Sequence, residues 1–389
     1  MTSHDFWLTD LTTPSGERTA MRVSAGRITG YGTPPAGGAT IDAKGRLVLP
    51  ALIEGHVHLD KVLWGTPWPG YTSGTTVKER IAREKQVRAS LSVNVETRGA
   101  LLVEAEIAFG TGHLRTHVDI DPDWGLSNLE AVLKIRERYA DQINIEIVAF
   151  PQSGILAAPG TADLLDQALR EGADLIGGLD PAYIDGDPKQ SLDIVFALAE
   201  KHGTGVDIHL HEGGPLGLFE LDLIAERTRA LHLGGKVTVS HAYCLGDASP
   251  DALATTADTL ARAGVSILTS APEHSMPPLR PLWSAGVVIF CGNDNIRDSW
   301  SPFGTGDLLE RANIAARQQN LVSDSELHAA LNLVTGAGAQ VIGLKDYGLA
   351  PGHRADFVLL EAPAVPETIA SPPRNRVVYK AGELVAGTL

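Results

Sequence analysis

The middle of the chain alternates short apolar runs with segments of helical periodicity. Apolar residues recur at helical spacing over residues 164–169 and 192–199, and Gly203 follows the second segment as at a helix end. Eight runs indicate strands, at 46–58, 114–120, 143–150, 175–179, 206–210, 237–241, 265–269 and 287–291. Eight strand–helix units in about 290 residues predict an α/β fold, a (β/α)₈ barrel of the TIM type. A doubly wound open sheet is the alternative, but no phosphate-binding glycine motif follows the first strand.

The two ends of the chain share another pattern, in which short β-type runs are broken by glycine and proline turns. Such runs occur at 6–8 and 21–23, and again at 355–360 and 376–379. Neither end is long enough to form a stable sheet alone, since small isolated β units are marginally stable. We therefore expect residues 1–48 and 344–389 to form one composite small β domain, a β-sandwich, beside a barrel of residues 49–343.

Composition narrows the class of protein. The chain is 43% hydrophobic and 20% charged, as in globular proteins, and 32 Lys and Arg against 47 Asp and Glu give a net charge of −15. This acidity argues against nucleic acid or an anionic membrane as partner, because both attract clustered cations. Only two cysteines occur, Cys244 and Cys291, and no leader or membrane-spanning run is visible. These features predict a cytoplasmic protein.

Polar residues gather at the carboxyl ends of the predicted strands, where barrels of this type place their active sites. Side chains two positions apart in a strand face the same side, so each HxH pair can point into the barrel. The residues are His56 and His58 in the first strand, Asp207, His209 and His211 in and after the fifth, His241 in the sixth and Asp294 after the eighth. Imidazoles and a carboxylate that converge from several strands predict a metal site.

These motifs resemble those of the amidohydrolase superfamily, and within it the cytosine deaminase-like branch. The segments that carry the resemblance are PALIEGHVHLDK at 50–61, RTHVD at 115–119, IVAFPQSGI at 147–155 and GNDNIRDSWSPFG at 292–304. Three further segments are more similar to the N-isopropylammelide isopropylaminohydrolases, which act on s-triazines: GGLDP at 177–181, SHAYC at 240–244 and DNIRDSWSPFGTGD at 294–307. Both groups have a (β/α)₈ barrel with a β domain built from the two chain ends.

The resemblance implies one divalent metal ion per subunit, Zn²⁺ or Fe²⁺, with Mn²⁺ as a further candidate. Matched motif by motif, the metal ligands are His56, His58, His209 and Asp294. The fourth predicted strand contains no lysine that could bridge two metals, which favours a single ion. Such an ion would lower the pKa of a bound water molecule from about 15.7 to about 7.

The resemblance also implies roles in the hydrolytic removal of an amine from a ring. Asp294 is expected to act as a base, His241 to hydrogen-bond the developing oxyanion, and Glu212 to pass a proton to the leaving amine. The expected substrate contacts are Gln152, His211, Asn295 and Trp300. The roles of Lys61 and His274 stay open.

The motifs combine features of two substrate classes. His211 matches the triazine enzymes, Glu212 matches cytosine deaminase, and Asn295 stands where cytosine deaminase has a carboxylate. The expected activity is a metal-dependent aminohydrolase that acts on the exocyclic amine of a cytosine-like pyrimidine or a related small N-heterocycle. The alternatives are an N-alkyl aminohydrolase of s-triazines, a cyclic amide hydrolase, and a silent barrel that only binds a heterocycle. The resemblance implies a homo-oligomer.

Overall fold

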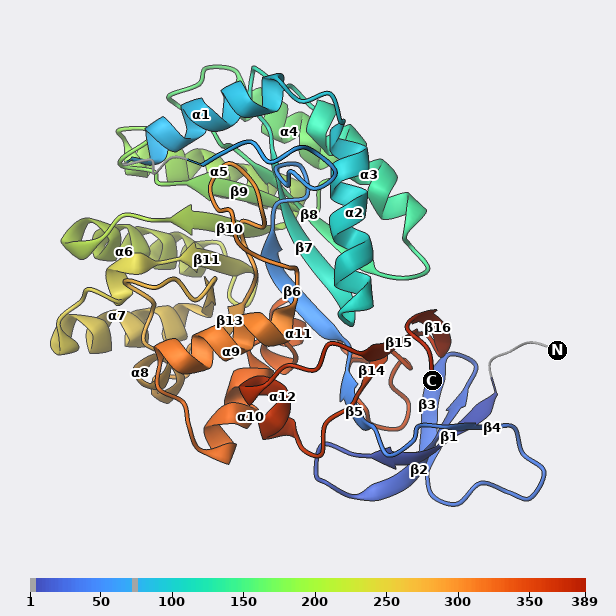
Figure 1. The fold of residues 1–389 in the computed structure, drawn as a ribbon. Coiled ribbons are helices and arrows are strands. Elements are labelled where there is room, and N and C mark those ends of the chain that lie inside the picture. Colours follow the sequence, from blue (N-terminus) through green and yellow to red (C-terminus); the bar gives the residue numbers. More distant parts are fainter. Residues whose placement is uncertain (1–4, 72–75) are drawn as a thin grey trace.

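The computed structural model describes residues 5–71 and 76–389. One of its two eight-stranded sheets is entirely parallel, and in it each strand pairs with the next along the chain (Figure 1). The strands are β6 (Leu52–Val57), β7 (Thr111–Asp119), β8 (Asn144–Phe150), β9 (Leu175–Leu179), β10 (Gly205–Leu210), β11 (Val237–His241), β12 (Val265–Thr269) and β13 (Ile289–Cys291). The predicted barrel is therefore present.

The predicted first strand, 46–58, is divided into two strands that belong to different sheets. The N–H of Ala51 donates to Asp356 O in the sheet of the chain ends, whereas the N–H of Leu52 donates to Gly110 O beside the barrel. The first half is β5 (Leu47–Pro50) and the second half is β6. The other seven predicted strands are present, with ends that differ by a few residues.

The barrel closes where β13 and the residues after it meet β6. Val57 forms a parallel bridge with Asp294, and the Asp294 N–H donates to His56 O at 2.7 Å. Each side of this seam has one position that only glycine can occupy, Gly55 in β6 and Gly292 after β13. A Cβ on Gly55 would lie 2.6 Å from the Phe290 ring, and a Cβ on Gly292 would lie 2.4 Å from His56 N.

Helices surround the barrel and bury the outward faces of its strands (Figure 1). In β10, Val206, Ile208 and Leu210 join this outer core, while Asp207 and His209 face the barrel interior. The helices are α1 (Val77–Ala89), α2 (Val95–Ala108), α3 (Ser127–Arg138), α4 (Thr161–Glu171), α5 (Pro188–His202), α6 (Gly214–Ala230), the 3₁₀ turn η1 (Tyr243–Leu245), α7 (Pro250–Ala263), α8 (Leu279–Ser284), α9 (Leu308–Gln318), α10 (Asp324–Asn332), α11 (Gly336–Val341) and α12 (Val365–Ala370). Among the described residues, no helix is long and apolar enough to span a membrane.

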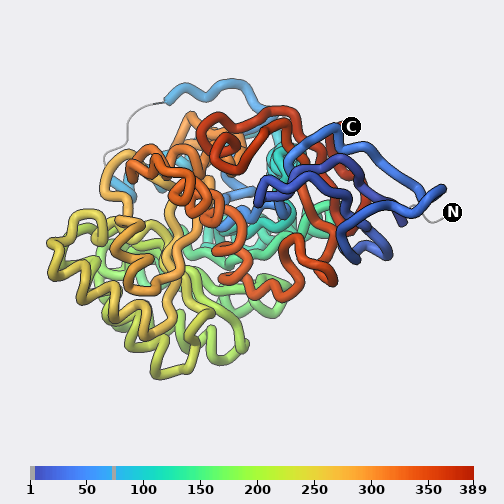
Figure 2. Tube along the Cα trace, turned by 90° about the horizontal axis from the view of Figure 1, so that it is seen from below, coloured from blue at the N-terminus to red at the C-terminus, as the bar shows by residue number. Residues whose placement is uncertain are grey.

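The two chain ends form a separate sheet, and Figure 2 shows these segments side by side at one end of the molecule. Its order is β16 (Glu383–Ala386), β15 (Arg376–Lys380), β14 (Phe357–Leu360), β5, β1 (Phe6–Thr12), β2 (Arg18–Ser24) and β3 (Arg27–Tyr31), and β4 (Thr40–Asp42) pairs with β1. Alternate residues serve different cores. Leu47 and Leu49 pack with the barrel, whereas Val48 and Phe357 belong to a core of this sheet alone.

Candidate active site

The structure brings together the four residues predicted as metal ligands, at the carboxyl ends of β6, β10 and β13. His56 Nε2 lies 3.4 Å from His58 Nε2, and Asp294 Oδ1 lies 3.6 Å and 3.4 Å from these two nitrogens. Ligand atoms of His209, His56 and His58 all lie within 4.8 Å of one another. All four side chains therefore face one point.

The protonation of these four residues suits a divalent cation. Burial lowers the pKa of His56, His58 and His209, which keeps the imidazoles neutral. Burial raises the pKa of Asp294, but its contacts with His58, His241 and His56 outweigh this effect and hold that pKa well below its usual range. Neither ring nitrogen of His209 has a hydrogen-bond partner among the described residues. Neutral imidazoles beside a carboxylate form a donor set that fits Zn²⁺ or Fe²⁺.

Further hydrogen bonds turn the ligand rings toward the common point. His58 Nδ1 donates to His117 O at 3.2 Å, and His56 Nδ1 donates to Ser240 Oγ at 3.0 Å. Ser240 Oγ in turn donates to Asp207 Oδ1 at 2.7 Å. Partners of this kind fix the tautomer of a metal-binding histidine and leave Nε2 free to coordinate.

A cavity with about 270 Å³ of empty space opens beside this cluster. Its lining includes all four predicted substrate contacts, Gln152, His211, Asn295 and Trp300, together with His241. The remaining lining residues are His58, Lys61, Phe150, Leu179, His209 and Asp294. His274 is exposed and does not belong to this lining.

The structure does not bring Glu212 to the cavity. Its Oε1 accepts the Tyr183 N–H at 2.5 Å, and its carboxyl group interacts with that of Glu220. Side chains alternate along an extended segment, so Glu212 points away from the side that His209 and His211 share. The expected proton donor is therefore not among the residues that line the cavity and instead binds the loop after β9.

His211 is oriented by Asp180, which the sequence analysis did not single out. Asp180 accepts hydrogen bonds from the His211 N–H at 2.6 Å and from His211 Nδ1 at 2.9 Å. Burial lowers the pKa of His211, but the carboxylates of Asp180, Asp294 and Glu212 together outweigh this effect, so the net shift is upward. The backbone of Asp180, His241 and Asp294 is left-handed, with φ of 36°, 75° and 60°. Non-glycine residues in this region are strained and often mark functional sites.

Lys61 is buried at the cavity within a network of charged groups. Its Nζ donates to Gln152 Oε1 at 2.9 Å and lies 3.2 Å from Asp119 Oδ1 and 3.7 Å from Glu84 Oε2. Glu84 and Arg88 come from the buried face of α1. Charged residues occur all around this helix, so no pattern in the sequence set Glu84 apart.

Glu54 is a second residue that the sequence analysis missed. Its carboxylate accepts hydrogen bonds from His56 N, Asn293 N and Asn293 Nδ2 at 3.0, 2.9 and 2.6 Å, and so joins both sides of the barrel seam. Burial raises the pKa of Glu54 to about 7. The sequence does carry a signal for Glu54, because it is an acidic residue within the apolar run of a predicted buried strand.

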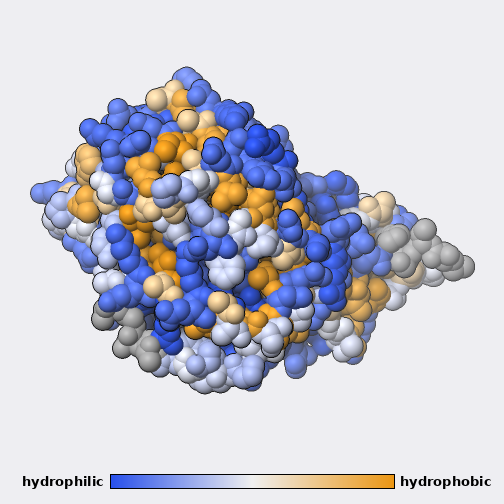
Figure 3. Space-filling view, turned by 90° about the horizontal axis from the view of Figure 1, so that it is seen from above, coloured by the Kyte–Doolittle hydropathy of each residue, from blue (hydrophilic) through white to orange (hydrophobic). Residues whose placement is uncertain are grey.

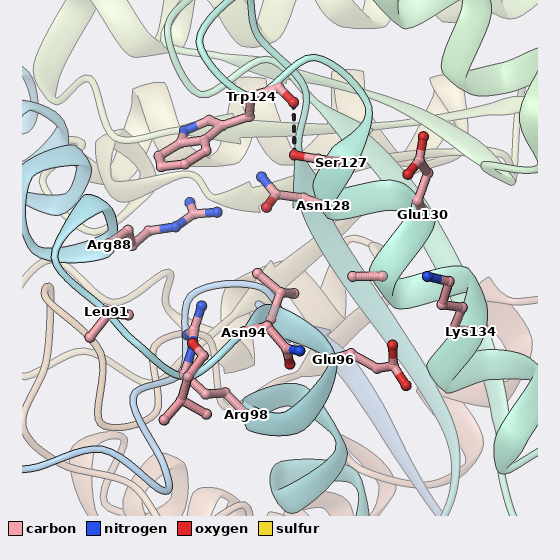
Figure 4. A pocket seen from close by; sticks show the side chains of 13 residues that line it. Arg88, Leu91, Asn94, Glu96, Arg98, Trp124, Ser127, Asn128, Glu130 and Lys134 are labelled. Atoms are coloured by element: carbon pink, nitrogen blue, oxygen red, sulfur yellow. Dashed lines mark hydrogen bonds between the residues drawn. The ribbon is translucent and has the colours of Figure 1, made fainter.

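A separate pocket, with about 840 Å³ of empty space, lies between α1, α2 and α3 (Figure 4). Arg88 points into it beside Trp124, and none of the four predicted metal ligands lines it. Arg88 also donates to Asp119 Oδ2 at 2.5 Å, so it separates this pocket from the network around Lys61.

Figure 3 shows apolar patches scattered among polar residues on the face viewed from above.

The fold and the site define a barrel enzyme with a metal-binding centre at the carboxyl ends of its strands. The chain belongs to the amidohydrolase family, whose model matches residues 39–386. It is a hydrolase that acts on carbon–nitrogen bonds other than peptide bonds.

Known proteins resemble the chain over nearly its full length. The structure of N-isopropylammelide isopropylaminohydrolase from Burkholderia multivorans ATCC 17616 is 41% identical, with a TM-score of 0.94 over 99% of this chain and 98% of that one. N-isopropylammelide isopropyl amidohydrolase of Pseudomonas sp. (strain ADP) is 32% identical over 89% of this chain and 87% of the relative. The structure of 5-methylcytosine deaminase from Klebsiella pneumoniae is 27% identical, with a TM-score of 0.90 over 98% of both chains.

Proposed function

We propose that this chain removes an exocyclic amine by hydrolysis from a cytosine-like pyrimidine or a related N-heterocycle such as an s-triazine. The observation that carries the proposal is the cluster of three histidines and Asp294 beside a cavity lined by polar side chains. The similarity to enzymes named for ammelide and for methylcytosine supports a ring substrate with an exocyclic amine.

One divalent ion per subunit, Zn²⁺, Fe²⁺ or Mn²⁺, held by His56, His58, His209 and Asp294, would supply hydroxide at neutral pH. The ionised Asp294 lies at the edge of the cavity, where it accepts a proton as the nucleophile attacks. His241 also lines the cavity, and neither of its ring nitrogens has a partner among the described residues. We assign it the hydrogen bond to the oxygen that develops charge.

His211 is better placed than Glu212 to serve the leaving amine. It lines the cavity, stacks on His241 with ring centroids 4.5 Å apart, and has its Nδ1 held by Asp180. A histidine whose far nitrogen is fixed by a carboxylate is a common arrangement for proton transfer. In this proposal, His211 donates the hydrogen bond to the ring nitrogen or the departing amine, and Glu212 holds the loop that carries Asp180.

Amine release from a defined panel tests the function. Purified protein loaded with Zn²⁺, Fe²⁺ or Mn²⁺ is offered cytosine, isocytosine, 5-methylcytosine, ammelide and N-alkyl ammelides, and ammonia or alkylamine is measured. We expect release from at least one compound, loss of release on chelation, and recovery when metal returns. No turnover across the panel with full metal content would contradict the proposal, and ring opening without amine release would indicate a cyclic amide hydrolase.

We propose further that the protein forms a homo-oligomer and is located in the cytoplasm. Both cysteines, Cys244 and Cys291, are free and buried, which suits a reducing compartment. Tyr183, Leu216 and Phe219 are partly exposed apolar side chains and offer surface for self-association. Light scattering on the purified protein measures the oligomeric state, and a monomer at micromolar concentration would contradict this part.

A further inference from the structure

One wall of the cavity is formed by Lys61 and Gln152, whose side chains are bound to each other. Lys61 Nζ donates to Gln152 Oε1 at 2.9 Å, and the Lys61 side chain is 2% exposed. An ammonium group has donors only, so Gln152 must turn its carbonyl oxygen toward Lys61 and its NH₂ group away. The charge of Lys61 thus sets the orientation of the amide.

Glu84 fixes the same wall from the side of α1. Its Oε2 accepts from Gln152 Nε2 at 3.4 Å and from the Trp300 indole N–H, and lies 3.7 Å from Lys61 Nζ. Its other oxygen accepts from Arg88 at 2.8 Å. A carboxylate has acceptors only, so this contact also requires the amide nitrogen of Gln152 on the side of Glu84. Three residues that line the cavity therefore depend on one buried carboxylate.

The wall that results presents hydrogen-bond donors to a bound ring. Gln152 Oε1 is turned to Lys61, while the second N–H of the Gln152 amide has no partner within 3.5 Å among the described residues. The Lys61 ammonium also lies 5.1 Å from the centroid of the Phe150 ring, and Phe150 lines the same cavity. A ring atom opposite this wall must accept hydrogen bonds, because an amino group there would face only donors.

We propose that Glu84 is a positioning residue that sets ring specificity: by fixing Lys61, Gln152 and Trp300, it makes the cavity select rings with an oxo oxygen opposite the Gln152 amide. The inference rests on the proposed function, since it takes the ring to lie in this cavity. It narrows the substrate class to oxo-substituted rings and disfavours rings with an amino group at that edge.

The test measures binding of two pyrimidines with opposite exocyclic groups, because uracil carries oxo oxygens where 2,4-diaminopyrimidine carries amino groups. Calorimetry on the metal-loaded protein gives Kd for uracil and for 2,4-diaminopyrimidine, and the amine assay on the same samples detects any turnover. We expect uracil to bind at least about tenfold more tightly in the wild type, as for one well-placed hydrogen bond. Glu84→Gln should reduce this preference to less than about threefold, while Glu79→Gln on the same helix should leave it unchanged, since Gln also serves at that capping position.

Four measured quantities separate this role from a merely structural one. Metal content and Tm are recorded for each variant, and the KM and kcat of any substrate found are compared, with KM expected to change more.

Should Glu84→Gln fail to fold, Lys61→Met should weaken uracil binding about tenfold and leave 2,4-diaminopyrimidine unaffected. Equal binding of both rings by the wild type, or an unchanged preference in a folded Glu84→Gln or Lys61→Met protein, overturns the inference. Failure of the proposed function is distinct, because it appears as no amine release with the ring preference intact.

Discussion

The backbone N–H of Asp294 donates to the carbonyl oxygen of His56 at 2.7 Å, so the bond that closes the barrel also joins two of the predicted metal ligands. Glu54 reinforces this link by accepting from His56 N and from Asn293 N. The position of Asp294 relative to His56 is therefore set by backbone hydrogen bonds, and a change at the seam should alter metal binding directly.

Replacing Gly292 with alanine should disturb this seam. The new Cβ would lie 2.4 Å from His56 N, and overpacking of a buried site typically costs about 1–3 kcal/mol. We expect a lower free energy of unfolding and less bound metal per chain, measured by denaturant titration and by elemental analysis. Gly30→Ala is the control, because a Cβ there meets nothing within 4 Å. Normal metal content in folded Gly292→Ala protein would contradict the prediction.

Asp207 should control metal affinity through Ser240 and His56. Asp207→Asn weakens the acceptor that orients Ser240, and loss of such outer partners typically costs about 10–100-fold in metal affinity. Competition with a chelator measures this affinity. Glu146→Gln is a matched control, since Glu146 and Asp207 both pair with Arg115 but only Asp207 reaches Ser240. Equal losses in the two variants would show that the Arg115 ion pairs, not the Ser240 contact, matter.

His211 and Glu212 should differ sharply in their effect on turnover. His211→Asn removes a side chain that lines the cavity, and loss of a proton-transfer group costs about 10²–10⁴-fold in rate. Glu212→Gln keeps an acceptor for the Tyr183 N–H, so we expect less than about a tenfold loss. Steady-state kinetics with the best substrate of the panel compares the two. A larger loss of rate in Glu212→Gln than in His211→Asn would indicate that Glu212 is the proton donor.

Glu220 should make stability fall as pH rises. Burial and the neighbouring Glu212 raise the pKa of Glu220 above its usual 4.5. Above pH 4.5 the folded state keeps a proton that the unfolded chain releases, so the free energy of unfolding decreases until the raised pKa is reached. In the Glu220→Gln variant, the amide can donate a hydrogen bond to Glu212 at every pH. We expect its Tm at pH 8 to rise by about 2 °C or more, with little change near pH 4.5. Glu226→Gln, exposed on the same helix, is the control, and a Tm gain independent of pH would refute this account.

Removal of the metal should destabilise the protein as well as stop turnover. Ligand binding to the native state stabilises it by about 4 kcal/mol at a free concentration 1,000 times Kd. Thermal unfolding with and without a chelator should therefore show a lower Tm for the stripped protein, restored by Zn²⁺. Identical curves, together with no stoichiometric ion in protein purified without chelator, would argue for a barrel that holds no metal.

Much of the fold and the ligand cluster could be predicted because the signals are local and periodic. Alternation in β10 places Asp207 and His209 on the inner side, and the HxH motif places His56 and His58 at a strand end. The same alternation argues against Glu212 at the cavity, since it directly follows His211. The family resemblance points the other way, to Glu212 as the proton donor.

Other features depend on contacts between distant parts of the chain. Asp180 serves His211 from a neighbouring strand, and Glu84 reaches the cavity from a helix whose own pattern marks no special position. The break at Ala51 has the same origin, because the chain changes sheets only where Asp356 offers an acceptor. Such partners become visible only once the barrel brings their elements together.

The pairing of β5 with β14 has a consequence for the order of folding. Residues 47–50 lead directly into the first barrel strand, yet their hydrogen-bonding neighbour is residues 357–360. During synthesis on the ribosome, every barrel strand emerges before that neighbour exists. The small sheet can therefore be completed only after all eight barrel strands have been synthesised, and until then the edge of β5 lacks its partner strand on this side.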